Sequence, residues 1–303
     1  MKPIDTPALS SMRAENRFDA LLAWYFVIIW GSGFLASKTG LQYAAPFTFL
    51  SLRYIFGIVC LIPWLAVSRP RWPTGKREFF HICIGGLLMH AINLGGSHYA
   101  QYLGMSAGVT ALILATQPLL TAVFAHRMMA QRLAVSQWLG VALGLAGVML
   151  VVWHKINISA VTVASLVAVG ISLAAITTGT LYQRVFCKTA DLHSSALIQF
   201  VASLLVVVPL AWTIEGFVVR WSWALILSIM FVVILASIMA VNALHILMRR
   251  GHATKVTSLF FLTPIVAVLL EWAMFNVVPT WLSAVGIGIT CAGVALVSGR
   301  RTA

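Results

Sequence analysis

The chain has 303 residues, of which 61% are hydrophobic and 9% charged, and its formal net charge is +13. A soluble domain draws about a quarter of its residues from the charged types, so this composition excludes an ordinary water-exposed surface. The basic residues lie mostly in short loops between apolar segments, where they orient a membrane protein. We therefore predict an all-α, polytopic membrane protein that contacts the lipid bilayer and no nucleic acid.

Ten apolar segments approach the roughly 20 residues that cross about 30 Å of hydrocarbon. These predicted spans are 20–37, 46–67, 79–101, 105–126, 133–153, 160–183, 192–213, 223–247, 254–275 and 279–298. Most of the 20 basic residues precede the first span or follow an even-numbered span. This bias predicts that both termini are cytoplasmic and that residues 1–19 form a cytoplasmic tail.

The first two spans each carry an unusual residue. Trp30 lies beside a patch of small residues, Gly31, Ser32 and Gly33. Its ring either forms a wall of a pocket for apolar or aromatic groups or packs against neighbouring helices. Arg53 is the one Arg or Lys that lies clearly within a predicted span and not at its end. A buried charge in a membrane is costly and typical of a functional position.

The third span carries regularly spaced polar residues, His90, Asn93, Ser97 and Gln101, with Tyr99 beside them. At about 100° per residue these four lie on one stripe of an α-helix. The stripe either lines a water-filled cavity or joins neighbouring helices through hydrogen bonds. The eighth span carries Asn242 and His245, one helical turn apart. Together these residues predict a site between the two helices.

The fourth and ninth spans share a proline, and each is predicted to kink there because proline cannot donate a backbone hydrogen bond. The two are Pro118, which follows Gln117, and Pro264. Their kinks are either bending points of a gate or static packing features. Glu271 is an acid within the ninth span, on the same outer half of the membrane as Arg53. The two either pair, form part of an outer gate or reach the surface separately.

A repeat relates the two halves of the chain. A shift of 146 positions aligns Pro63 with Pro209, Pro118 with Pro264, Gly33 with Gly179, Gly140 with Gly286, and Gly147 with Gly293. We predict two five-helix repeats, residues 20–155 and 156–303. An odd number of spans in each half requires opposite orientations in the membrane, an arrangement typical of carriers.

Glycines in the fifth and tenth spans allow close helix packing. They favour intramolecular packing between the halves, or alternatively a dimer seam, so we expect a monomer or weak homodimer.

Other function classes lack their motifs in this chain. No phosphate-binding Gly-x-x-x-x-Gly-Lys-Ser/Thr loop, His-Glu-x-x-His pair or nucleophile elbow occurs, and the four cysteines are scattered. We therefore expect no catalytic residues, no cofactor and no bound metal, although an intramembrane enzyme stays an alternative. Glu271 lies near a span end, which favours passage down a gradient or exchange over obligatory proton coupling.

The order of several short motifs resembles that of a known family. The sequence opens its first span with Trp30-Gly31-Ser32-Gly33, continues with Pro46 and Arg53-Tyr54, and ends each half with a spaced glycine pair, Gly140 and Gly147 or Gly286 and Gly293. In these features it is similar to the ten-helix, EamA-type branch of the drug/metabolite transporter superfamily. The resemblance implies a bacterial inner-membrane carrier with a central cavity that works by alternating access. Members include exporters of amino acids, among them aromatic ones.

The hypothesis from sequence is an exporter of small amphipathic metabolites, including aromatic amino acids, that uses no ATP. Its polar site comprises His90, Asn93, Ser97, Gln101, Gln117, Asn242 and His245, with Trp30 and Tyr99 facing the apolar end. Its gate comprises Pro118, Pro264, Arg53 and Glu271. The alternatives are a multidrug or other metabolite carrier of the same fold and a passive scaffold.

Overall fold

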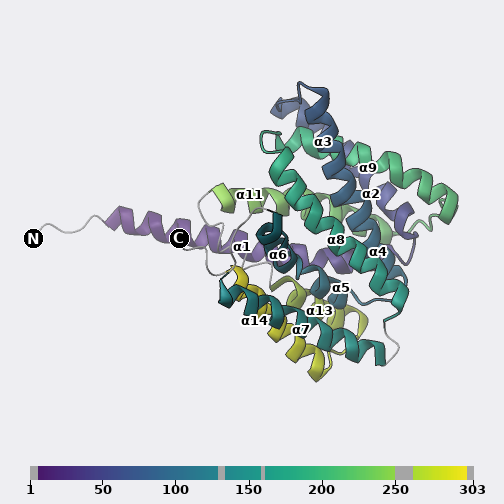
Figure 1. Ribbon diagram of the computed structural model, residues 1–303. Helices are drawn as coiled ribbons and strands as arrows, with labels where there is room; N and C mark the ends of the chain where they lie inside the picture. The colour runs from purple at the N-terminus through teal and green to yellow at the C-terminus, as the bar shows by residue number, and fades with distance from the viewer. Residues whose placement is uncertain (1–5, 129–133, 158–160, 250–261, 299–303) are drawn as a thin grey trace, which may run out of the picture.

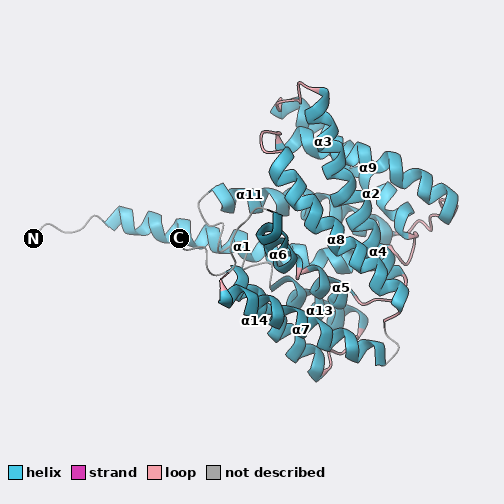
Figure 2. Cartoon of the chain, viewed as in Figure 1, coloured by secondary structure: helices cyan, strands magenta, loops and turns pink. Residues whose placement is uncertain are grey.

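The protein is a bundle of helices (Figures 1 and 2). The computed structural model describes residues 6–128, 134–157, 161–249 and 262–298. Within these residues the backbone forms helices and one isolated bridge, between Ala44 and Val219. The start of α1 projects away from the bundle as a single helix (Figure 1).

The described helices follow the predicted spans closely. The first half contains α1 (Thr6–Gly40), α2 (Pro46–Ser68), α3 (Lys76–Gly86), the π-helix η1 (Leu87–Ile92), α4 (Asn93–Tyr102), α5 (Ala107–Leu114), α6 (Gln117–Met128) and α7 (Val135–Asn157). The second half contains α8 (Val163–Phe186), α9 (Leu192–Glu215), α10 (Trp223–Met230), the π-helix η2 (Phe231–Ala240), α11 (Val241–Arg249), α13 (Thr263–Phe275) and α14 (Trp281–Ser298).

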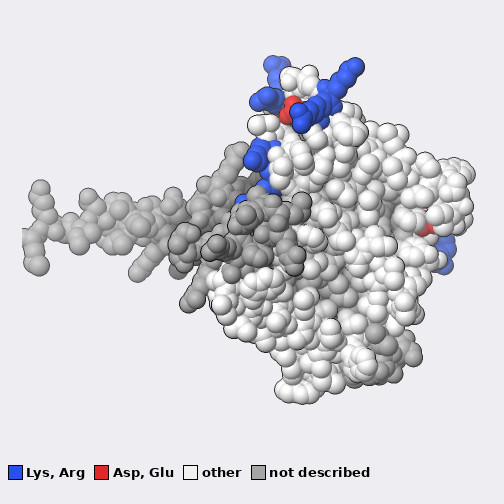
Figure 3. Space-filling model, viewed as in Figure 1, with Lys and Arg blue, Asp and Glu red and all other residues white. Residues whose placement is uncertain are grey.

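Length and composition allow eight of the described helical segments to cross a membrane, and α13 and α14 are shorter apolar helices. The start of the predicted ninth span, residues 254–261, lies outside the described residues. Large apolar side chains cover the outside of the bundle, as a lipid-facing surface requires: Trp223 and Trp281 are each 80% exposed. In Figure 3 the Lys and Arg side chains gather where α3 begins, and most of the visible face is uncharged.

The two π-helices lie at equivalent positions of the repeat. A shift of 146 positions places η1 wholly within η2. A π-helix widens each turn from i→i+4 to i→i+5 and is frequent at functional sites. Each π-helix therefore rotates the directions in which the side chains after it point, near the middle of its span. A pattern based on α-helical periodicity alone does not predict this rotation.

The packing of α7 against α14 shows that the halves have opposite orientations. Gly140 lies against Gly293, and Gly147 lies against Gly286. As the chain advances along α7 its contacts move backwards along α14, so these two equivalent helices are antiparallel. The predicted packing between the glycine-rich spans of one chain is thereby confirmed.

The second helices of the two halves, α2 and α9, form the other antiparallel pair at the seam. The start of α2, at Phe47, lies at the end of α9, at Glu215. Towards the other end, the rings of Trp64 and His193 lie 6.0 Å apart. Two equivalent pairs thus join the halves around one pseudo-twofold axis, and their seam is where a central site can form.

The predicted interruption of the fourth span is seen as a turn at residues 115–116, between α5 and α6, just before Pro118. Pro118 and Pro264 are each the second residue of a helix, α6 or α13, where proline leaves no intrahelical hydrogen bond unmade. The residues that precede 262 lie outside the described ones, so a kink at Pro264 stays a prediction. Prolines inside helices are found at Pro63 in α2 and Pro209 in α9.

The glycine contact between α7 and α14 predicts a strong position dependence within α14. A Cβ at Gly293 would collide with the backbone nitrogen of Gly144 and lie 2.6 Å from the carbonyl oxygen of Gly140. We expect Gly293→Ala to destabilise the protein by about 1–3 kcal/mol through overpacking. Gly288→Ala is the matched control, because nothing lies within 4 Å of its Cβ position. Equal melting temperatures of the two purified variants in detergent would contradict this packing.

Candidate functional site

A half-buried arginine from the first half reaches the π-helix of the second half. The Nη2 of Arg53, on α2, donates to the Oγ of Ser237, on η2, at 3.0 Å. The Ser237 hydroxyl in turn donates to the carbonyl of Val232 at 2.7 Å, five residues earlier. This is the spacing of a π-helical hydrogen bond, so η2 both orients the hydroxyl and supports the arginine.

The equivalent helix of the second half makes the corresponding contact with the first half. The Oε1 of Gln199, on α9, lies 3.2 Å from the Nε2 of His90, on η1. A shift of 146 positions relates Arg53 to Gln199 and Tyr54 to Phe200. Each half therefore sends a polar side chain from its second helix to the π-helix of the other half. The chemistry of the two contacts differs, since one carries a charge and the other does not.

Aromatic rings enclose this seam. Tyr54 and Phe200 lie 5.4 Å apart between ring centroids, and His90 meets the edge of Phe200 at 5.1 Å. The Tyr54 hydroxyl donates to the carbonyl of His90 at 2.9 Å. One helical turn before Arg53 on α2, the ring of Phe49 lies 5.6 Å from that of His98. Polar groups and aromatic rings thus lie next to each other at this seam.

We define the central polar cluster as Arg53, His90, His98, Gln199 and Ser237. Two neighbours of Arg53 on α2 bring the imidazoles to this place: the Tyr54 hydroxyl donates to the His90 carbonyl, and the Phe49 ring lies 5.6 Å from that of His98. Three buried nitrogens of the cluster have no hydrogen-bond partner: Nε of Arg53, Nδ1 of His90 and Nε2 of His98. Unpaired buried polar groups are costly, and proteins normally satisfy them with water, ions or ligands. This cluster therefore has unfilled capacity to bind a polar group.

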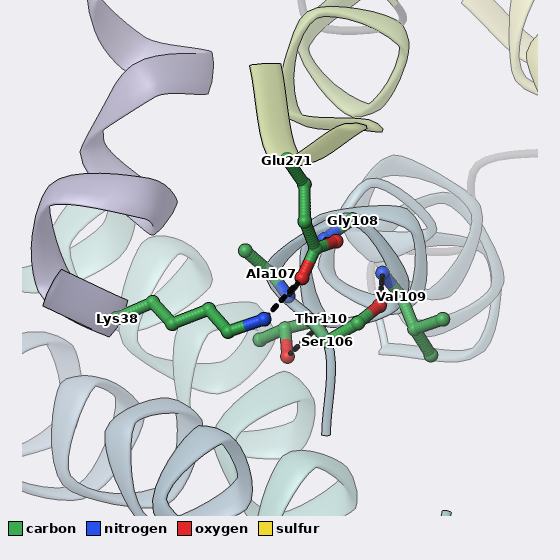
Figure 4. A network of polar contacts seen from close by, with 7 residues as sticks. All are labelled: Lys38, Ser106, Ala107, Gly108, Val109, Thr110 and Glu271. Carbon is green, nitrogen blue, oxygen red and sulfur yellow. Dashed lines mark hydrogen bonds and ion pairs between the residues drawn. The ribbon is translucent and has the colours of Figure 1, made fainter. Parts of the chain in front are cut away.

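A second polar network closes the end of the bundle where α1 ends and α5 begins (Figure 4). Glu271, on α13, accepts hydrogen bonds from the backbone amides of Ala107 and Gly108, each at 2.9 Å. Its Oε1 also lies 2.6 Å from the Nζ of Lys38, at the end of α1. The Glu271 carboxylate thus caps the first turn of α5 and ties three helices together. Of the three alternatives for Glu271 and Arg53, pairing is therefore not the one that the structure shows.

Glu215 performs the same task at the start of α2. Its carboxylate accepts from the amides of Phe47 and Thr48, at 2.9 and 2.7 Å, and from the Thr48 hydroxyl at 2.7 Å. The loop after α1 also pairs with the loop after α9, through the Ala44–Val219 bridge and an arginine–carbonyl hydrogen bond from Arg220 to Gln42. Two capping carboxylates and a loop bridge therefore hold this end of the bundle closed.

Comparison with known proteins identifies the family. The EamA-like transporter family matches residues 18–153 and again residues 162–299. The chain belongs to the EamA-like transporter family. It is therefore a membrane transporter and not an enzyme, and the two matched segments confirm the internal repeat.

Several relatives cover most of the chain. An uncharacterized inner membrane transporter, YedA, of Escherichia coli K12 is 25% identical over 93% of this chain and 90% of its own length. A probable amino-acid metabolite efflux pump of the same organism is 27% identical over 83% of this chain and 85% of its own. A crystal structure aligns with a TM-score of 0.65 at 16% identity, covering 92% of this chain and 96% of its own, which shows the shared fold.

Within this EamA-like fold, the predicted polar stripe of span three divides between two neighbours. His90 faces α9 through Gln199, whereas Asn93 accepts from the Ser172 hydroxyl of α8 at 2.8 Å. The π-helical turn at η1 separates the two directions. Ser97 donates to its own helix at the carbonyl of Leu94. Gln101 is 6% exposed, and neither polar atom of its side-chain amide has a partner.

Tyr99 does not join the central polar cluster. It is 37% exposed on the bundle surface, with its ring 6.2 Å from that of Phe47. Trp30 packs in a mostly apolar group that includes Phe26 and Leu244. Gln117 donates to the Thr180 hydroxyl at 2.9 Å and so joins α6 to α8. Asn242 is half-buried on α11, and the side chain of His245 lies outside the described residues.

Sequence reasoning missed four members of these networks: Lys38, Gln199, Glu215 and Ser237. Gln199 had a usable signal, because it is the repeat equivalent of Arg53. Lys38 and Glu215 lie at span ends, where charged residues are ordinary and give no specific signal. Ser237 is a single hydroxyl in an apolar segment, which normally bonds to its own helix.

The Glu271 network predicts unequal roles for its two charged partners. The Glu271 side chain is 3% exposed and that of Lys38 is 23% exposed. We expect Glu271→Ala to cost about 2–4 kcal/mol, since two buried amides of α5 lose their acceptor. Lys38→Met should cost about 1 kcal/mol or less, because a partly exposed ion pair contributes little. Thermal unfolding of both variants in detergent measures the difference. A larger loss for Lys38→Met would show that the ion pair, and not the cap, dominates.

Proposed function

We propose that this protein exports small amphipathic metabolites across a bacterial inner membrane, and that amino acids, including aromatic ones, are among its substrates. The observation that carries the proposal is the central polar cluster, which lies at the seam of two inverted halves, keeps buried polar atoms unpaired and has aromatic walls. A solute with one polar and one apolar end matches those surroundings. Two relatives, an inner membrane transporter and a probable amino-acid metabolite efflux pump, support the location and the substrate class.

The proposed mechanism is alternating access without ATP hydrolysis. The charge bias of the loops supports an outer location for the Lys38 end of the bundle. In this state the Glu271 and Glu215 caps close that end. Bound solute supplies the missing partners of the central polar cluster, and the two halves then rock about the seam. Opening outward requires the caps to exchange their backbone partners for water, which is available at that end of the bundle.

Reconstitution tests the proposal directly. Liposomes that contain only the purified protein are loaded with radiolabelled phenylalanine, and efflux is followed with and without unlabelled amino acid outside. We expect substrate-dependent efflux above that of protein-free liposomes, and faster efflux under exchange conditions. A screen of twenty amino acids without flux for any of them would end the amino-acid proposal and favour a carrier of other metabolites.

Two polar residues of span three distinguish a binding role from helix–helix packing. Gln101→Leu removes an amide that has no partner, so we expect an unchanged or higher melting temperature together with efflux at least about tenfold slower. Asn93→Leu removes the partner of Ser172 and should lower the free energy of unfolding by about 1–2 kcal/mol, which is seen as a lower melting temperature. Both variants replace a polar residue of the same helix, α4, by leucine, so each serves as the control for the other. Full efflux activity in Gln101→Leu would place Gln101 outside the transport path.

A further inference from the structure

Arg53 is a membrane-embedded cation without an acidic partner in the described structure. It lies about 10 Å along α2 from the start of the helix, close to the helix midpoint at Gly57. The ion pairs among the described residues are Lys38 with Glu271 and His193 with Asp191, and neither includes Arg53. A charge at such depth normally has a counter-charge or marks a substrate path.

The other acids of the chain are engaged elsewhere or lie far along the sequence from the seam. Glu215 caps α2, and Asp191 caps the start of its own helix through the amides of His193 and Ser194. Glu78 lies in the first turn of α3. Asp5, Glu15 and Asp19 precede the hydrophobic part of the first span. Among the described residues Arg53 is therefore a half-buried positive charge without an acidic partner, which one bound anion would neutralise.

The guanidinium is only partly used by the protein. Nη2 donates to Ser237, while Nε is buried without a partner. His98 is 3% exposed, packs against the ring of Phe49 one helical turn before Arg53 on α2, and has an unpartnered Nε2. A guanidinium offers a planar fork of donors that matches the two oxygens of a carboxylate. Neighbouring imidazoles add donors of hydrogen bonds to the same group.

We propose that Arg53 binds the carboxylate of the transported solute, so that a carboxylate is required and an amino group is not. The inference rests on the proposed function and narrows it to carboxylate-bearing solutes. The apolar part of the solute lies against the rings of Tyr54, Phe200 and Phe49, which pack against the imidazoles of His90 and His98. The described residues around Arg53 offer no carboxylate to an ammonium group, so a cationic amine would meet a like charge.

Three solutes with the same ring test which group is recognised: 3-phenylpropionate carries only the carboxylate, phenethylamine only the ammonium, and phenylalanine both. Binding to the purified full-length protein is measured by calorimetry, and efflux is measured in liposomes. We expect 3-phenylpropionate and phenylalanine to bind and to compete with each other, and phenethylamine not to bind.

The variant arm uses Arg53→Gln, which places in α2 the residue that α9 carries at the equivalent position. We expect it to weaken 3-phenylpropionate binding about tenfold to a hundredfold, the range for losing a charge-assisted hydrogen bond. Arg53→Lys keeps the charge but not the planar set of donors, so its affinity for 3-phenylpropionate should fall less than that of Arg53→Gln. Arg77→Gln, at an exposed position in the first turn of α3, is the control and should bind like the wild type.

The outcomes are distinct. Phenethylamine binding as tightly as 3-phenylpropionate, or unchanged 3-phenylpropionate affinity in Arg53→Gln, would overturn the carboxylate inference while leaving transport intact. If Arg53→Gln does not fold, the solute series on the wild-type protein decides alone. Absence of binding and efflux for all three solutes, together with no flux in the amino-acid screen, would reject the proposed function and this inference with it.

Discussion

Polar groups inside a bilayer must find their partners within the protein, because lipid offers none. Most polar side chains of the described helices meet this constraint through hydrogen bonds within the protein. Thr177 and Thr290 bond to carbonyls of their own helices, Asn93 bonds to Ser172, and Glu271 satisfies the first turn of a neighbouring helix. The unpaired nitrogens of the central polar cluster are an exception to this constraint. The fold places them at the seam without a partner in the protein.

Pseudo-symmetry brings equivalent helices of the two halves together at the seam. Where the equivalent side chains differ, the seam becomes chemically asymmetric. Inverted halves bring α2 beside α9, so Arg53 and Gln199 occupy equivalent positions and each reaches the π-helix of the other half. Identical side chains there would make a symmetric site with two like charges in low dielectric. One charged and one neutral residue instead form a site with a direction, as binding a single asymmetric solute requires.

The sequence by itself determined the class of structure. Apolar segments of sufficient length can only be helices in lipid, and the distribution of basic residues predicts their orientation. The glycine register predicted the repeat and the close packing of α7 with α14, because only glycine permits backbones to approach so closely. These features depend on the chain's local composition and spacing, which sequence shows directly.

Tertiary structure decided which polar groups meet. The π-helical turn at η1 rotates His90 towards α9 and Asn93 towards α8, so one predicted stripe became two separate contacts. Glu271 paired with Lys38 and the amides of α5, and not with Arg53, because the ends of α1, α5 and α13 converge. Such partners are far apart in the chain, and only the folded arrangement of the helices brings them within a few ångströms.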